Sequence, residues 1–210
     1  MITLYAVTWR TDAPVLDEDG LALLADGDLA MVVGPAHGTA SRDDALAHGR
    51  IVEQVASAVD VLPIRYGATA ADTDEARALL REHGSTWAAR LQKVEGCAEI
   101  AIRAAPPPAD AERAESGAAH MARLVSRNRL LDSAETEVGE LLTGRCRVVR
   151  RLAGHEELRL SCLVERANVE SVHSLLEEWA STRKDMVVSV TGPWAPYSFV
   201  ADGEDSGVAL

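Results

Sequence analysis

Cysteine and histidine are the side chains in this sequence with the widest chemical repertoire. Cys97, Cys146 and Cys162 are odd in number and lack the C-x-x-C spacing of zinc sites and redox motifs. The histidines are scattered without the spacing of metal ligands, at His37, His48, His83, His120, His155 and His173. The sequence also lacks G-x-S-x-G, H-E-x-x-H, G-x-G-x-x-G and Walker motifs. We therefore expect a protein that is not an enzyme, with no cofactor, no bound metal and free thiols.

Several of these residues have a structural interpretation instead. The cysteines fall on predicted strands or at the entry to one, so we expect buried, unreactive thiols. His48 and His173 lie beside apolar helical stripes, and we interpret them as helix-flank residues. The segment Asp17-Glu18-Asp19-Gly20 lacks the alternating oxygen ligands of an EF-hand and is expected to be an acidic surface turn.

The residue types with a case for protein binding are arginine and the aromatic side chains. Arg65 and Tyr66 end the apolar run 61–67, where alternation turns Arg65 to the face opposite Ile64 and Tyr66. Two interpretations of Arg65 stay open: a solvent-facing arginine on an edge strand, or an interface residue, since arginine is enriched at interfaces.

The last strand leads into a segment that Gly192, Pro193 and Pro196 make stiff, and this segment carries Trp194, Tyr197 and Phe199. The rings either close the end of the C-terminal sheet or anchor a partner, because Trp and Tyr dominate binding hot spots. We expect the segment to be ordered, with at least one ring packed on the C-terminal domain.

Charge and composition limit the partners. The 210 residues are 47% hydrophobic, with 33 acidic and 21 basic residues and a net charge of −12. This charge disfavours nucleic acid and anionic membranes as main partners. No stretch approaches the length of a membrane span, and Met1 to Tyr5 has the pattern of a strand rather than of a secretory signal. We expect a cytoplasmic, globular protein.

Periodicity predicts an α+β fold with two domains. Residues 1–94 form a small α/β domain: strands at 2–8 and 29–33, a helix from Ser41, a strand at 61–67 with Pro63 at an edge, and a helix over 73–94, broken near Gly84. The boundary falls within 70–95. Residues 95–200 follow the ferredoxin-like β-α-β-β-α-β order and end in the extended aromatic segment. Residues 201–210 are expected to be a disordered acidic tail.

In the second domain, strands are predicted at 98–104, 146–152, 158–164 and 186–190. A long helix carries one apolar stripe, and a shorter helix begins at Asn168. The stripe of the long helix consists of Met121, Leu124, Leu131, Val138 and Leu141.

Five segments, taken in order, resemble the gas vesicle protein F/L (GvpF/GvpL) family. Val61-Leu62-Pro63-Ile64-Arg65-Tyr66-Gly67 is similar to its L-P-[VI]-R-[FY]-G segment, and Gly192-Pro193-Trp194-Ala195-Pro196-Tyr197-Ser198-Phe199 is similar to its G-P-W-P-P-Y-S-F ending. The other three are 94–100, 116–121 and 160–166. The resemblance spans the chain from the first strand to Val200.

The resemblance implies a non-enzymatic gas vesicle accessory protein, either a minor structural component or an assembly factor. Its implied partners are the small shell protein and other gas vesicle accessory proteins, and its implied location is the cytoplasm and the gas vesicle. The binding residues would come from Arg65, Tyr66, Trp194, Tyr197 and Phe199. A ferredoxin-like regulatory module that binds a small molecule stays open as the alternative, although it needs a pocket with converging polar groups.

Overall fold

The structure is a computed structural model that describes residues 1–12, 20–36, 41–107, 117–154 and 156–200. The predicted acidic turn at Asp17, the predicted tail 201–210, His37 and His155 lie outside these ranges. The described chain divides into two compact units. Unit 1 contains Met1–Ala98 and the residues from Trp194 onward, and unit 2 contains Glu99–Pro193.

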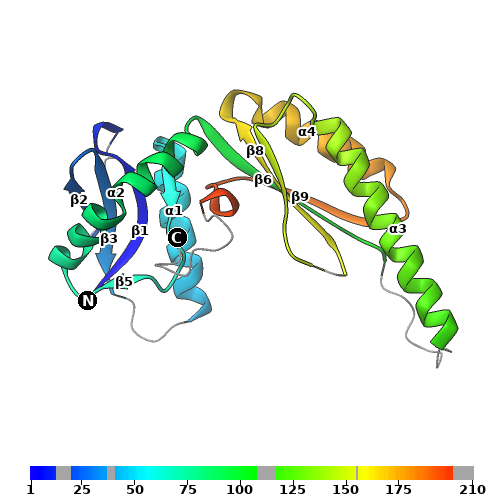
Figure 1. The fold of residues 1–210 in the computed structure, drawn as a ribbon, viewed down its shortest axis with the longest axis horizontal. Coiled ribbons are helices and arrows are strands. Elements are labelled where there is room, and N and C mark those ends of the chain that lie inside the picture. Colours follow the sequence, from blue (N-terminus) through cyan, green and yellow to red (C-terminus); the bar gives the residue numbers. More distant parts are fainter. Residues whose placement is uncertain (13–19, 37–40, 108–116, 155, 201–210) are drawn as a thin grey trace. The chain divides into compact units, whose positions relative to one another are not determined.

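Unit 1 is built around a sheet with the strand order β2-β3-β1-β4, in which β5 also pairs with β1 (Figure 1). The central strand β1 is buried along almost its whole length, as expected for a strand with neighbours on both sides. β2 and β3 form a hairpin, and Gly27 takes a φ of +59° at its turn, a conformation that suits glycine. The strands are β1 (Ile2–Trp9), β2 (Ala22–Asp26), β3 (Leu29–Pro35), β4 (Val61–Pro63) and β5 (Thr69–Ala70).

Two helices pack on this sheet, α1 (Arg42–Ala58) and α2 (Thr73–Val94). Ser41 caps α1 as predicted, with its hydroxyl oxygen accepting the N–H of Asp44 at 3.1 Å. Asp72 caps α2 in the same way. Helix α2 runs through Gly84, so the predicted break there is wrong. A core joins the sheet to α1 through residues including Tyr5, Ala6, Val32, Ile51, Val52, Val55 and Val61.

The predicted strand over 61–67 is shorter in the structure. β4 ends at Pro63 and lies at the end of the strand path, which agrees with the expected edge position of this proline. The chain then turns, with the N–H of Ala68 donating to the carbonyl of Arg65 at 3.3 Å and Gly67 at a φ of +95°. Arg65 and Tyr66 therefore lie in a loop, because this turn replaces further strand pairing.

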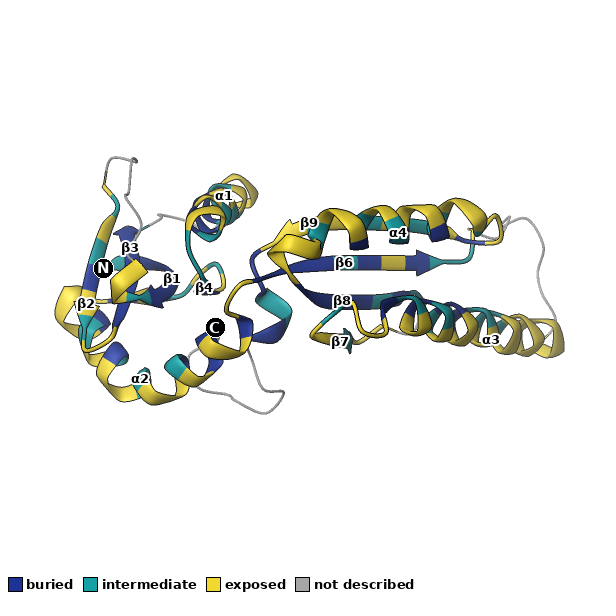
Figure 2. Cartoon of the chain, turned by 90° about the horizontal axis from the view of Figure 1, so that it is seen from above, coloured by how far each residue is buried: buried dark blue, intermediate teal, exposed yellow. Residues whose placement is uncertain are grey.

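Unit 2 has the element order β6-α3-β7-β8-α4-β9 and a sheet with the strand order β7-β8-β6-β9. β7 and β8 pair antiparallel, with Val148 opposite Leu163. The elements are β6 (Cys97–Ala105), α3 (Gly117–Leu142), β7 (Val148–Arg151), β8 (Leu158–Glu165), α4 (Val169–Thr182) and β9 (Val187–Trp194). Both helices pack over the sheet through one core, whose members include Ile100, Ile102, Leu131, Val138, Leu158, Leu160, Val172 and Leu176 (Figure 2).

Three further expectations about this half differ from the structure. Cys146 precedes β7 instead of lying in it, and β9 continues to Trp194 instead of ending at 190. The apolar stripe of α3 is only partly used: Leu131 and Val138 are buried, whereas Met121 is 59% exposed. Periodicity identifies residues that share a helix face, and it does not say how far the sheet beneath that face extends.

Candidate functional site: the aromatic segment and the loop after β4

The aromatic segment after β9 packs on unit 1, so the predicted packing on the C-terminal domain is corrected. Ala195 is 2% exposed and belongs to the core between the sheet and α1, and Val200 is fully buried. The N–H of Ala195 donates to both carboxylate oxygens of Glu53 on α1, at 3.1 and 3.0 Å. A charged acceptor makes this hydrogen bond stronger than one between neutral groups. The segment is thereby fixed to α1 by apolar contacts and by one charge-assisted hydrogen bond.

The three rings of this segment have different surroundings. Phe199 is 8% exposed and Tyr197 packs against the same core as Ala195, whereas Trp194 keeps 45% of its surface exposed. Burial of the Tyr197 hydroxyl, together with the negative charge of Glu53, raises the pKa of this phenol above its ordinary range. Two rings therefore hold the segment in place, and Trp194 presents apolar surface to solvent.

Arg65 and Tyr66 also lie in unit 1, in the loop after β4. Arg65 is exposed, which agrees with both interpretations of this residue. Tyr66 is half-buried, and its ring meets the edge of the His48 imidazole with the ring centres 5.7 Å apart. The loop therefore offers one cation to solvent and rests on α1 through an aromatic contact.

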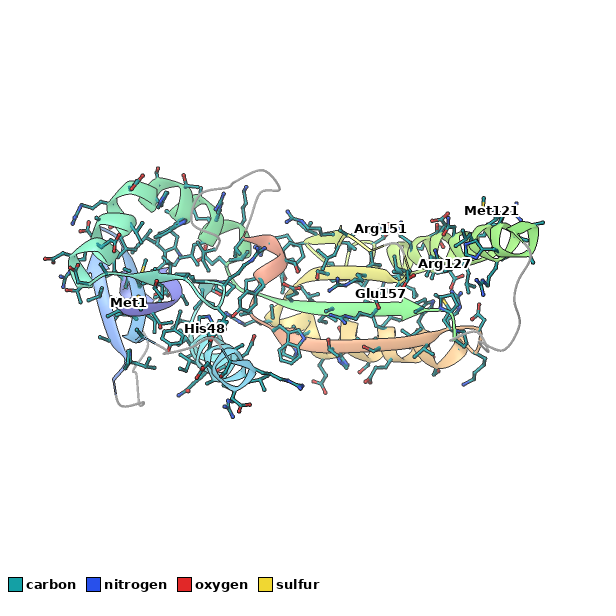
Figure 3. The ribbon with its side chains drawn as sticks, turned by 90° about the horizontal axis from the view of Figure 1, so that it is seen from below. Met1, His48, Met121, Arg127, Arg151 and Glu157 are labelled. Atoms are coloured by element: carbon teal, nitrogen blue, oxygen red, sulfur yellow. The ribbon has the colours of Figure 1, made fainter. Side chains whose placement is uncertain are left out.

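His48 is a core residue, so its interpretation as a helix-flank residue is wrong. It is 1% exposed, and its ring stacks on Tyr5 with the ring centres 4.8 Å apart. Figure 3 labels His48 on α1. Its Nε2–H donates to the carbonyl of Ile64 at 2.8 Å, which satisfies a backbone group just past the end of β4. This histidine thus fixes the start of the loop that carries Arg65 and Tyr66.

Helix α1 is the element that supports both groups of predicted site residues. His48 holds the loop after β4, and Glu53 holds the aromatic segment. The two side chains are separated by about 7.5 Å along the helix axis. Glu53 is not among the predicted site residues. The signal was present, because a carboxylate stands beside the buried residues Val52 and Val55 in the apolar stripe of a helix.

Two groups of polar contacts in unit 2 connect neighbouring helices and strands. Glu137 on α3 accepts hydrogen bonds from the Trp179 indole N–H at 3.0 Å and from Arg183 at 2.8 Å. These donors, with Ser133, lower the pKa of Glu137. In the sheet, the hydroxyl of Ser161 donates to the buried carboxylate of Glu99 at 2.7 Å. Both sites join neighbouring elements of unit 2.

Cys146 and Cys162 influence each other's ionisation. Hydrogen bonding to the Cys162 thiol and the positive charge of Arg145 lower the pKa of Cys146. Hydrogen bonding to the Cys146 thiol, together with burial, raises the pKa of Cys162. Cys162 is fully buried and Cys146 is half-buried, so only Cys146 combines a lowered pKa with access to reagents. The expectation of buried thiols therefore holds for Cys97 and Cys162, whereas Cys146 is only half-buried.

Within the described ranges, no group of three or more His, Cys, Asp or Glu side chains is placed to hold a metal ion. None of the helices that the structure describes combines the length and apolar character needed to cross a membrane. The chemistry that this arrangement supports is recognition: an exposed tryptophan and an exposed arginine on a rigid support are typical anchors of protein interfaces.

Comparison with known proteins gives a consistent match. A model of the family described as gas vesicle synthesis protein GvpL/GvpF matches residues 2–201. Gas vesicle protein F of Streptomyces sp. strain CB03234 is 25% identical over 85% of this chain and 87% of its own length. Gas vesicle protein L of the same strain is 24% identical over 78% of this chain and 71% of its own length.

Two crystal structures share the fold. The gas vesicle protein GvpF of Anabaena sp. PCC7120 superimposes with a TM-score of 0.74, and that of Microcystis aeruginosa with a TM-score of 0.76. Each is 14% identical in sequence; the first match covers 96% of both chains, and the second covers 96% of this chain and 99% of the other. The mixed α/β architecture with two antiparallel sheets is therefore common to these proteins.

Proposed function

Because the chain belongs to the gas vesicle synthesis protein GvpL/GvpF family, we propose that it is a gas vesicle accessory protein that binds the small shell protein. The family match over residues 2–201 carries this proposal. The relatives named gas vesicle proteins F and L support it, and neither name describes an enzyme. The protein acts in the cytoplasm and at the gas vesicle, as an assembly factor or minor structural component, and other gas vesicle proteins are its further partners.

A physical argument supports shell-protein binding. A subunit that lines a gas space must carry a large apolar surface, and such a surface aggregates in water before assembly. A partner that covers this surface and adds net charge keeps the complex in solution. The net charge of −12 suits that task.

We place the binding surface on unit 1, at the two features that α1 supports. Trp194 and Arg65 are the exposed members of the predicted set, and they contact the partner directly. Tyr66 adds the exposed part of its ring. Tyr197 and Phe199 act indirectly, because their burial fixes the segment that presents Trp194.

We further propose that unit 2 is a ferredoxin-like domain. The order β-α-β-β-α-β of its elements supports this assignment, as does its strand order, in which the first strand β6 lies between β8 and β9. The domain boundary then lies near the start of β6, between Ala98 and Glu99, and the chain returns to unit 1 at Trp194.

The test is capture of the shell protein by the tagged, full-length chain from cells that express the gas vesicle genes. We expect the wild type to capture the shell protein, and Trp194→Ala to lose most of it while keeping its melting temperature. Leu46→Ala is the matched control, because Leu46 is 55% exposed and lies on α1. No capture by the wild type, or equal losses in the two variants, would contradict the proposal.

A further inference from the structure

Two of the three cysteines share one hydrophobic core. Cys162 on β8 is fully buried in the core of unit 2, and Cys146, which precedes β7, packs against that core. Cys97 is also buried, but it belongs to unit 1. The proposed binding surface uses neither Cys146 nor Cys162, so a role for this pair of thiols has to come from their own chemistry.

An extra residue before β7 decides which face of the sheet Cys146 takes. Val148 lies opposite Leu163, and the N–H of Arg147 also donates to the carbonyl of Leu163, at 2.8 Å. Two successive residues thus lie opposite one residue of β8, which is the arrangement of a β-bulge. Continued regular pairing would instead bring Cys146 opposite Glu165, on the face that Leu163 also takes.

The bulge places Cys146 on the face of Cys162. With the extra residue counted, Cys146 comes across from Val164, and side chains two residues apart on a strand lie on the same face. Val164 and Cys162 both belong to the core under the helices, and Cys146 packs against that core. Hydrogen bonding between the two thiols agrees with this placement. The backbone pairing therefore brings the two sulfur atoms together.

Their surroundings give the two thiols different parts in a reaction. Hydrogen bonding to Cys162 and the charge of Arg145 lower the pKa of Cys146, and the half-buried side chain of Cys146 is open to small reagents. Cys162 is fully buried, and its pKa is raised. An oxidant therefore reacts first at Cys146, and Cys162 is the neighbouring thiol that can complete a disulfide.

We propose that Cys146 and Cys162 form a reversible disulfide when the protein meets a hydroperoxide. The Cys146 thiolate attacks one peroxide oxygen, the O–O bond breaks, and Cys146 becomes a sulfenic acid. The Cys162 sulfur then attacks the Cys146 sulfur, the S–O bond breaks, and the oxygen leaves as water with the Cys162 proton. With hydrogen peroxide, two thiols and one peroxide give one disulfide and two water molecules, and the two thiols supply both electrons.

The first step prepares the second. The cause that raises the pKa of Cys162 most is hydrogen bonding to Cys146, and the negative charge of the Cys146 thiolate adds to it. A sulfenic acid does not carry this charge, so Cys162 releases its proton more readily once Cys146 is oxidised.

The position of Cys146 allows the closer approach that an S–S bond of about 2 Å requires. Cys146 lies between the turn at Gly144, where φ is +73°, and the start of β7 at Val148. Its backbone can therefore shift without breaking the pairing of β7, the edge strand that lies beside β8 in Figure 2. In a reducing cytoplasm a disulfide of this kind is transient, because dithiols reverse it by thiol–disulfide exchange.

The test treats the reduced, full-length protein with a small excess of hydrogen peroxide and maps its cysteines by mass spectrometry without reduction. We expect two of the three thiols to disappear, a peptide pair that joins Cys146 to Cys162, and a free Cys97. Dithiothreitol should restore all three thiols. Cys97→Ala is the matched control and should form the same disulfide at the wild-type rate.

Two further variants separate the steps. Cys162→Ala should leave a sulfenic acid at Cys146, which dimedone traps and which excess peroxide converts to a sulfinic acid. Cys146→Ser changes the less buried position and keeps the test decisive if Cys162→Ala folds poorly: Cys162 should then stay reduced.

Three results would overturn the proposal. The first is a wild type in which Cys146 ends as a sulfinic acid while Cys162 stays free. The second is a disulfide that involves Cys97 or joins two chains through Cys146. The third is oxidation of Cys162 in Cys146→Ser as fast as in the wild type, because Cys146 would then not be the thiol that reacts first.

Discussion

The carboxylate of Glu53 accepts the backbone N–H of Ala195, a residue 142 positions later in the chain. This contact joins the first helix to the last described segment and makes unit 1 discontinuous in sequence. Along the sequence, the chain therefore returns to unit 1 only after the strands of unit 2. Sequence changes at either end of this contact should affect the same unit.

Replacing Glu53 should destabilise unit 1. Glu53→Ala removes the acceptor of the Ala195 N–H, and we expect a loss of about 1–3 kcal/mol in the free energy of unfolding. Glu53→Gln keeps one acceptor oxygen and should cost less. Urea denaturation of both variants measures the effect, with Glu82→Ala as an exposed acid of α2 for comparison. A loss in Glu82→Ala as large as in Glu53→Ala would show that the contact with Ala195 contributes nothing specific.

The two large rings at Phe199 and Trp194 should differ in their contribution to stability. Phe199→Ala leaves a cavity at a buried site, so we expect a loss of about 3 kcal/mol. Trp194 keeps 45% of its surface in solvent, and Trp194→Ala should cost about 1 kcal/mol or less. Thermal unfolding of the two variants gives the comparison, and the reverse order would mean that Trp194 holds the segment.

Glu137 should make unit 2 sensitive to acid. The hydrogen bond from Trp179, then those from Ser133 and Arg183, lowers the pKa of Glu137 below its value in the unfolded chain. A carboxylate with a lowered pKa adds stability above the unfolded pKa, which is about 4.3, and this stability is lost as the pH falls through the folded pKa. The Glu137 side chain is 42% exposed, so solvent screening keeps the effect below about 1 kcal/mol.

Denaturant unfolding at a series of pH values from neutral to acidic measures this contribution. Glu137→Gln should be less stable than the wild type at neutral pH and should approach it in acid. Glu140→Gln changes an exposed carboxylate on the same helix and should keep the full acid dependence. If Glu137→Gln left the pH dependence of the free energy of unfolding unchanged, Glu137 would not contribute to acid sensitivity.

Cys146 should react first among the three thiols. The thiol of Cys162 and the charge of Arg145 lower the pKa of Cys146, and its side chain is half-buried, whereas Cys97 and Cys162 are buried. We expect iodoacetamide at mildly alkaline pH to modify Cys146 faster than the other two, because the thiolate is the nucleophile. Peptide mass spectrometry over time follows each thiol. Cys162→Ala should slow the reaction at Cys146, and an unchanged rate would show that the thiol–thiol bond does not activate it.

The periodicity of the chain was sufficient to predict most of the architecture. Alternation identified the strands of unit 2, and helical spacing, with the cap at Ser41, identified the helices; Asn168 precedes α4 without a capping hydrogen bond from its side chain. The G-P-W and L-P-I-R-Y-G segments indicate the family without any tertiary contact. These features are local, because hydrogen bonding within an element and the pattern of its faces depend on neighbouring residues.

The tertiary structure determined which segment packs against each face of a helix or strand. The sequence marks Tyr197 and Phe199 as rings that pack, but only the fold shows that Tyr197 packs on the core of unit 1, where Ala195 meets Glu53. The sequence places His48 beside an apolar stripe. Only the tertiary structure shows that His48 is a core residue bound to the Ile64 carbonyl. Periodicity states which residues share a side, whereas the partner of that side depends on chain segments that are far apart in sequence and come together only on folding.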